Sequence, residues 1–274
     1  MGGFRYNNSD TTRILEDAEL IVCFNSAVDT VAGVSRQTEG GDPTISSSVV
    51  NEYGTVADKL VFEFALAKKD MSDFSYDEQR HVERWLTSPK FSMPIQFFGC
   101  GHDDTYKYYG KFTQTEWSVS DDGFYSVACT FEVNGNYAYE EYNRGFSSPS
   151  RTADSWSIIL YDESDELEEW VYPVVTISPN GDNASCSMTF ISDDNHQMTI
   201  NTEINDTLTF DCKRCTVSRG NGRKVYYSQI GWADIENIYW PRLRPGENQI
   251  SVTGNVNLNF KYEAPVKIVG GWLA

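Results

Sequence analysis

The residue pair best suited to chemistry in this chain is Cys212 and Cys215, which form a Cys-x-x-Cys motif. Such a pair can supply half of a structural zinc site or a thioredoxin-like redox centre. The zinc site needs a second pair or histidine ligands at comparable spacing, and the redox centre needs a βαβ setting; the sequence offers neither. Residues 208–217 are predicted to form one strand, in which side chains three apart face opposite sides. We therefore expect neither metal binding nor redox function at this pair.

The three histidines are also poor candidates for catalysis. His81 falls in a predicted helix, whereas His102 and His196 fall in polar turns. Acyl transfer by a nucleophile and a base needs a histidine oriented by a third group, and no nucleophile-elbow sequence accompanies any of them. Residues 193–196, Asp-Asp-Asn-His, are consecutive turn formers and predict a turn, not a metal site. We expect no catalytic and no metal-binding residues.

Acidic residues are concentrated at positions 162–169, where six of eight residues are Asp or Glu. Calcium loops space their ligands around a glycine turn, and this run has neither feature. We interpret it as a solvated hairpin tip or linker. Paired carboxylates for glycoside hydrolysis stay an open possibility, since their separation of roughly 5–9 Å is set by the fold. The sequence has no P-loop, no dinucleotide-binding glycine pattern and no interleaved basic and aromatic residues, so no cofactor is expected.

The overall charge argues against binding of nucleic acid or anionic lipid. The chain of 274 residues carries a net charge of −18, and such partners require cationic groups. It shows neither a secretory signal at the N-terminus nor an apolar run of roughly 18 residues, so we expect synthesis in the cytosol and no membrane contact. The cysteines at 23, 100, 129 and 186 lie in apolar or alternating segments, which favours buried, reduced thiols.

The chain is predicted to be mainly β, because aromatic residues make up 14% of it. One helix is predicted, beginning with the capping box of Ser75 and Glu78 and ending before Pro89. Residues 25–54 are rich in Ser, Thr, Gly and Val and predict a long loop or an extended hairpin. The strands predicted in the first half are 18–24, 60–66, 93–98, 106–112, 116–120 and 124–132, the last two joined by an Asp-Gly hairpin turn.

The second half predicts a β-sandwich, because short strands alternate with turns at about ten-residue spacing from residue 174 onward. A polar stretch at 143–155 indicates the linker, so we divide the chain into domains 1–148 and 149–274. Near the end, Pro245 and Gly246 suit the central positions of a type II turn, with Asn248 beyond them. This turn leads into a closing strand pair and is predicted to be structural.

Three passages carry a resemblance to a known family: the helix at 78–86 followed by apolar strands, the strand-then-aromatic passage 124–139, and the closing stretch 243–250. In their order and spacing they resemble the distal tail proteins of long-tailed, non-contractile phages. One departure is Asn134-Gly135-Asn136, where the family usually has a proline. The resemblance implies an N-terminal tail-tube-like split β-barrel with one helix over residues 1–148 and a C-terminal galectin-like β-sandwich over 149–274.

The resemblance also implies a structural, non-enzymatic role in the virion. Six copies would form a hub ring that joins the tail tube to the baseplate at the tail tip, after assembly in the host cytoplasm. Its partners would be the tail tube protein and tail-associated hub, tape-measure or receptor-binding proteins, with DNA only in transit through the lumen. In this setting residues 25–54 become the candidate loop for reaching a neighbouring subunit or stacked ring. The candidate contact residues in it are Val34, Arg36, Gln37, Pro43 and Ile45.

Two alternatives remain open. The first is a carbohydrate-binding module for host adhesion, in which tryptophans of the second half supply stacking platforms, although tryptophans of sandwiches are more often core residues. The tryptophans concerned are Trp156, Trp170, Trp232 and Trp240. The second is a cell-wall hydrolase, which needs a convergent acidic or metal pocket that the sequence does not locate.

Overall fold

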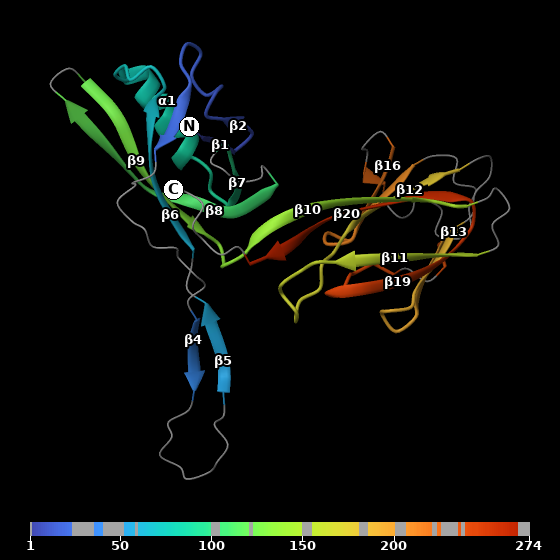
Figure 1. Ribbon diagram of the computed structural model, residues 1–274. Helices are drawn as coiled ribbons and strands as arrows, with labels where there is room; N and C mark the ends of the chain where they lie inside the picture. The colour runs from blue at the N-terminus through green and yellow to red at the C-terminus, as the bar shows by residue number, and fades with distance from the viewer. Residues whose placement is uncertain are drawn as a thin grey trace, which may run out of the picture. The chain divides into compact units, whose positions relative to one another are not determined.

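The computed structural model (Figure 1) is mainly β, as predicted, with a single helix among the residues that it describes. These are residues 2–23, 36–40, 52–57, 60–99, 105–120, 123–149, 155–180, 186–200, 207–220, 224–225, 235–236 and 239–267. The chain divides into two compact units, one running to Tyr139 and including Lys267, the other comprising Glu140–Val266. Within the described part, the helix is too short and too polar to cross a membrane.

The first unit is built on one antiparallel sheet in the order β2-β1-β7-β8-β9-β6-β3. Its strands are β1 (Gly3–Tyr6), β2 (Ser9–Asp10), β3 (Leu20–Cys23), β6 (Val61–Lys68), β7 (Met93–Phe98), β8 (Tyr106–Ser120) and β9 (Gly123–Val133). An isolated bridge links the two ends of this strand order: the amide of Val22 in β3 donates to the carbonyl of Gly2, just before β1, over 2.9 Å. Across the described residues no continuous ladder closes the sheet, so it is an open, split structure and not a closed barrel.

Aromatic side chains fill the core of the first unit. Phe4 is fully buried and stacks on the Trp85 ring at a centroid distance of 5.2 Å, and Tyr6 meets Phe112 edge to face at 5.0 Å. The Trp85 indole N–H also donates to the Tyr6 carbonyl over 2.9 Å, which satisfies its polar atom inside the core. The helix and strand β1 are therefore fixed to each other by both packing and hydrogen bonding.

Helix α1 (Tyr76–Thr87) begins as the sequence predicts. The Ser75 hydroxyl accepts a hydrogen bond from the Glu78 amide, and the Glu78 carboxylate accepts one from the Ser75 amide over 2.7 Å. The same carboxylate pairs with the ammonium of Lys68, a residue only 6% exposed. Burial alone would raise the pKa of Glu78, but the hydrogen bonds from Lys68 and Ser75 outweigh it and lower that pKa. The capping box thus also anchors the helix to strand β6.

One prediction for the first half was wrong, because β8 is one continuous strand and not two. Gln114, one of the polar residues between the predicted strands, pairs with β9 opposite Thr130, and Phe112, the last residue of the first predicted strand, lies opposite Phe131. The register shifts between these pairs, so the intervening Thr113 forms a bulge. The bulge interrupts the alternation of apolar and polar residues, so the sequence pattern at this point resembles a loop between two strands.

The second unit consists of two sheets that enclose a common core (Figure 1), which confirms the predicted sandwich. One sheet has the order β17-β16-β15-β12-β20-β10 and the other β11-β19-β13-β14-β18. Their strands are β10 (Ala138–Ser147), β11 (Trp156–Asp162), β12 (Val174–Pro179), β13 (Cys186–Phe190), β14 (His196–Ile200), β15 (Leu208–Asp211), β16 (Thr216–Arg219), β17 (Lys224–Val225), β18 (Ile235–Glu236), β19 (Gly246–Thr253) and β20 (Val256–Val266). Both sheets contribute fully buried side chains, among them Ile158, Met188, Phe210, Val252 and Phe260.

Strand β10 carries the chain from the first unit into the second. Residues 143–147, part of the predicted linker, belong to this strand, because Tyr142 and Phe146 pack on the sandwich core while polar residues face outward. The predicted boundary between residues 148 and 149 lies beyond β10, inside the second unit, and stays a prediction. The galectin-like character of the sandwich also stays a prediction.

Candidate functional site

The turn before β19 brings together the three residues predicted to have a structural role. Gly246 has a φ of +89°, which suits the third position of a type II turn and strains any residue with a Cβ. The Asn248 side chain bridges the turn: its carbonyl oxygen accepts from the Arg244 amide, and its NH2 group donates to the carbonyls of Arg244 and Gly246. Pro245 precedes Gly246 and is half-buried. This constellation shapes the backbone and offers no reactive group.

The segment predicted to reach a neighbouring subunit contains a hairpin of β4 (Arg36–Gly40) and β5 (Glu52–Ala57). The backbone of Arg36 pairs with Ala57 and that of Gln37 with Val56. Among the described strands, these two pair only with each other. The other three predicted contact residues lie outside the described residues: Val34, Pro43 and Ile45.

The Cys-x-x-Cys pair corrects one premise of the sequence analysis. It lies in the turn between β15 and β16 and not inside a strand. The Asp211 carboxylate accepts from the Arg214 amide over 3.0 Å, and Cys215 adopts a positive φ of 52°, which together turn the chain. Cys212 is buried whereas Cys215 is exposed, and both are free thiols.

Buried thiols elsewhere are poor nucleophiles. Burial raises the pKa of Cys129 to about 12 and that of Cys186 to about 12. A thiol with such a pKa stays protonated at neutral pH, and the thiolate is the reactive form. Over the described part of the chain, no group of three or more His, Cys, Asp and Glu side chains is arranged to hold a metal ion.

The turn at 193–196 forms as predicted, but Asp193 has a role that the sequence did not reveal. Its side chain is 4% exposed and accepts two hydrogen bonds from the Arg242 guanidinium, at 3.0 and 3.1 Å. That guanidinium lies over the Trp170 ring at 4.1 Å. His196 stacks on Tyr239 and contacts the Asp193 carbonyl at 2.7 Å. No local pattern links Asp193 to a partner so far along the chain, so only the fold reveals this anchor.

The acidic run at 162–169 is not wholly solvated, which corrects its interpretation as a hairpin tip or linker. Asp162 ends β11 and is 2% exposed, and within the described residues neither carboxylate oxygen accepts a well-formed hydrogen bond. Burial raises the pKa of Asp162 to about 6; the backbone N–H of Ser164 lowers it in part, and the Glu163 charge adds a smaller increase. The position of Asp162 in the sequence could have predicted its burial, because it continues the inward-facing alternation of Ile158 and Leu160.

The described tryptophans do not form stacking platforms for a sugar. Trp156 and Trp240 pack against the sandwich core, and the Arg242 guanidinium covers Trp170. Trp232 lies outside the described residues. The three described tryptophans of the second half therefore give the carbohydrate hypothesis no support.

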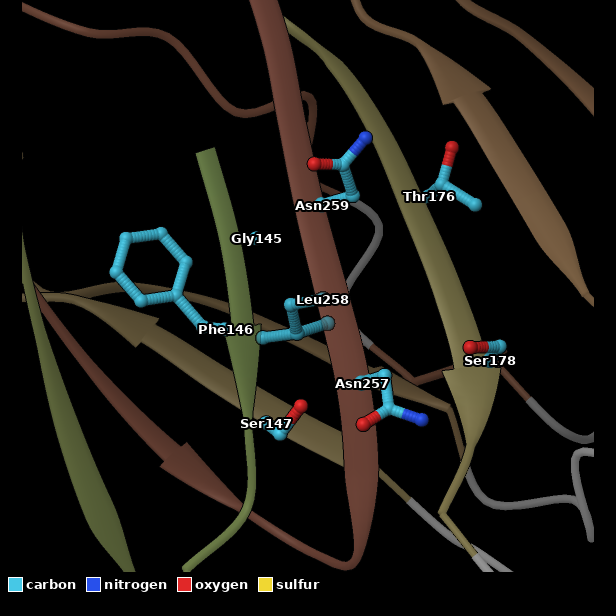
Figure 2. Close-up of a pocket in the computed structure, with 8 residues that line it drawn as sticks. All are labelled: Gly145, Phe146, Ser147, Thr176, Ser178, Asn257, Leu258 and Asn259. Carbon is cyan, nitrogen blue, oxygen red and sulfur yellow. The ribbon is translucent and has the colours of Figure 1, made fainter. Parts of the chain in front are cut away.

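An open groove of about 280 Å³ lies on the outer face of the second unit, across β10, β20 and β12 (Figure 2). Figure 2 shows the two asparagines of β20 with Thr176 and Ser178 on one side and Gly145 and Ser147 on the other. The complete lining is Gly145, Phe146, Ser147, Thr176, Ser178, Asn257, Leu258 and Asn259. No charged residue lines it, and the sequence analysis did not identify it.

Comparisons with known proteins place this geometry in context. Residues 6–135 match a family model described as a phage tail protein N-terminal domain, and residues 137–262 match a phage tail C-terminal domain. Among curated proteins, none matches the chain.

Solved structures share the fold. The Dit protein of phage SPP1, described as a paradigm of the hub adsorption apparatus in phages that infect Gram-positive bacteria, is 15% identical with a TM-score of 0.58. That match covers 96% of this chain and 99% of Dit. A chain of the phage P2 baseplate, in its activated conformation with Ca, is 9% identical with a TM-score of 0.54 and matches over 98% of this chain and 100% of its own.

Proposed function

Because the chain belongs to this family of phage tail proteins, we propose that it is a distal tail protein, a structural component of the virion that forms the hub at the tail tip. The observation that carries the proposal is the likeness to SPP1 Dit, which extends from end to end and includes both units. A protein that shared only the sandwich would match half of such a chain. The family is one of tail proteins and not of enzymes, and we propose no catalytic activity.

In this proposal six copies form a ring. The N-terminal domain, residues 1–148, lines the ring and continues the tail tube, and the galectin-like domain, residues 149–274, holds baseplate, tape-measure or receptor-binding proteins. The separate β4–β5 hairpin supports this arrangement, since within the described chain it pairs with no other strand and is available to a neighbour. Assembly takes place in the host cytoplasm.

The charge of the chain fits passage of DNA through the lumen. A net charge of −18 on each copy repels phosphate, so DNA slides without binding. This repulsion acts only within about 10 Å at moderate salt, so it requires acidic residues on the lumen itself.

The test of the hub role uses purified protein and virions. A concentrated solution is expected to contain particles of six times 31.1 kDa, with six-fold rings in negative stain. Antibodies against the chain should label the distal end of the tail, and cross-linking of intact virions should give a ladder that ends at six copies. Labelling of the capsid or of the tail shaft would refute the proposal.

The hydrolase alternative is tested with the same protein. The purified chain should leave peptidoglycan intact over hours at neutral pH. Release of soluble muropeptides, abolished by a single carboxylate substitution, would instead establish an enzyme.

A further inference from the structure

The groove of the second unit is formed by a regular polar surface on one sheet. Along β20 the buried residues Leu258 and Phe260 alternate with Asn257 and Asn259, which face outward. Pairing between strands places Asn259 beside Thr176, and Thr176 beside Thr209. The outward face is therefore lined by side-chain amides and hydroxyls in rows across the strands.

Several of these polar groups have unused hydrogen-bonding capacity. Ser147, Ser178 and Asn259 make no side-chain hydrogen bond within the described residues, and the Asn257 amide reaches the Pro179 carbonyl only at 3.5 Å. Ser178 and Asn259 are half-buried, so part of each side chain stays accessible from the groove. Amides and hydroxyls both donate and accept, and neither changes charge between pH 5 and pH 8.

The shape of the groove depends on Gly145. A Cβ at this position would approach the Asn259 side-chain oxygen at 3.8 Å, an ordinary contact, so the glycine is not required by the backbone. Its missing side chain leaves the space beside Asn259 open. A larger residue at 145 would fill the groove without straining the fold.

Charge is absent from the lining although the chain as a whole is strongly acidic. Along β20 the next outward residue is Lys261, whose ammonium is paired with Glu141 at 2.9 Å. A neutral lining neither attracts anions nor compensates cations. It suits a ligand whose groups also both donate and accept hydrogen bonds.

We propose that this groove binds a neutral carbohydrate, with Asn257, Asn259 and Thr176 as its hydrogen-bonding residues. A volume of about 280 Å³ is just below the roughly 300–1,000 Å³ of ligand sites, which suits a short segment of a glycan. A surface glycan of the host is the source that a tail-tip protein would meet. This binding is a function beyond the hub role, and the choice of a host glycan rests on the proposed place of the chain at the tail tip.

The test begins with the full-length chain on an array of bacterial glycans that includes neutral oligosaccharides and their phosphate- or carboxylate-bearing counterparts. Binding to neutral glycans is expected. The best neutral oligosaccharide is then titrated against the double variant Thr176→Val with Asn259→Leu, which keeps side-chain volume and removes hydrogen bonding. We expect a loss of affinity of about tenfold or more, because each lost hydrogen bond contributes about a factor of five.

A matched control is Ser187→Ala with Thr189→Val on β13, in the other sheet, which should bind as tightly as the unmodified chain. Absence of any neutral glycan ligand, preference for the charged counterparts, or equal weakening in the control would overturn the proposal. The proposal would also be overturned if the chain bound another tail protein but no glycan, and if the groove variant lost that protein binding. Incorporation of the groove variant into tails is then measured. Only the hub proposal predicts this incorporation, so the result distinguishes failure of the hub role from failure of glycan binding.

Discussion

Asp162 shows how strongly burial controls a single charged residue in this chain. Its carboxylate is buried, and the charge of Glu163 and the Tyr262 phenol both interact with it. The backbone N–H of Ser164 offsets only part of the cost of burial. Burial also raises the pKa of Tyr262 to about 12. The Tyr142 hydroxyl donates to Glu140 at 2.8 Å and lies 3.4 Å from Glu163, so it does not compensate Asp162.

We predict that Asp162→Asn stabilises the chain at alkaline pH. The folded-state pKa of about 6 lies above the usual 3.8, so the stability from holding the proton is complete below pH 4 and lost as pH rises through 6. At pH 8 the charged form costs about 3 kcal/mol, and at pH 5 roughly half as much. Thermal unfolding at both values should show the larger gain at pH 8.

The control for this prediction is Glu168→Gln in the same acidic run, an exposed position where no gain is expected. An equal gain from Asp162→Asn at pH 5 and at pH 8 would show that packing and not ionisation is responsible.

Gly246 carries the second prediction at this scale. Gly246→Val places a β-branched residue at a φ of +89°, so the free energy of unfolding of the second unit should fall by about 1–3 kcal/mol. Gly246→Asn should cost less, because asparagine tolerates positive φ. Denaturant unfolding followed by tryptophan fluorescence measures both, and equal losses would mean that backbone strain is not the cause.

At the scale of elements, helix α1 depends on contacts from several strands. Glu83 accepts hydrogen bonds from the Thr115 hydroxyl at 2.7 Å and the Trp117 indole at 3.0 Å, while Trp85 bonds to β1. These contacts fix which face of the helix meets the sheet. The helix is thus part of the structure that holds the split sheet in shape.

We predict that Glu78→Ala destabilises the first unit by about 2–4 kcal/mol, because it removes the cap and leaves the buried Lys68 ammonium without its carboxylate. Asp77→Ala, in the same turn but exposed, should cost under about 1 kcal/mol. The double variant Lys68→Met with Glu78→Ala should recover part of the loss. Failure to recover any would assign the effect to the cap alone.

The sequence predicted elements well where local chemistry decides them and poorly where distant partners do. The capping box at Ser75 and the alternation along β20 depend on residues within a few positions, so their patterns were sufficient. The bulge at Thr113 and the anchor between Asp193 and Arg242 depend on partners 17 and 49 positions away, beyond the reach of a local pattern. The neutral groove is likewise made by three strands whose order only the fold provides.

At the scale of the whole molecule, the two units differ in what they offer to partners. The first presents a split sheet and a separate hairpin, and the second presents a sandwich with a neutral groove. The proposed ring contacts and the proposed glycan groove therefore reside in different units. Variants can separate ring formation from glycan binding, because residues 36–57 belong to the first unit whereas Thr176 and Asn259 belong to the second.

The final prediction concerns ring formation. Replacing residues 36–57 with a short Gly-Ser linker should leave the first unit folded, since β4 and β5 pair with no other described strand, yet it should prevent stable rings. Light scattering should then give the mass of a single chain, somewhat below the 31.1 kDa of the unmodified chain, in place of six times that value, with unchanged circular dichroism and thermal midpoint. The milder change Arg36→Glu should weaken rings without abolishing them. Six-fold rings that persist in the linker variant would show that the subunits associate through other surfaces.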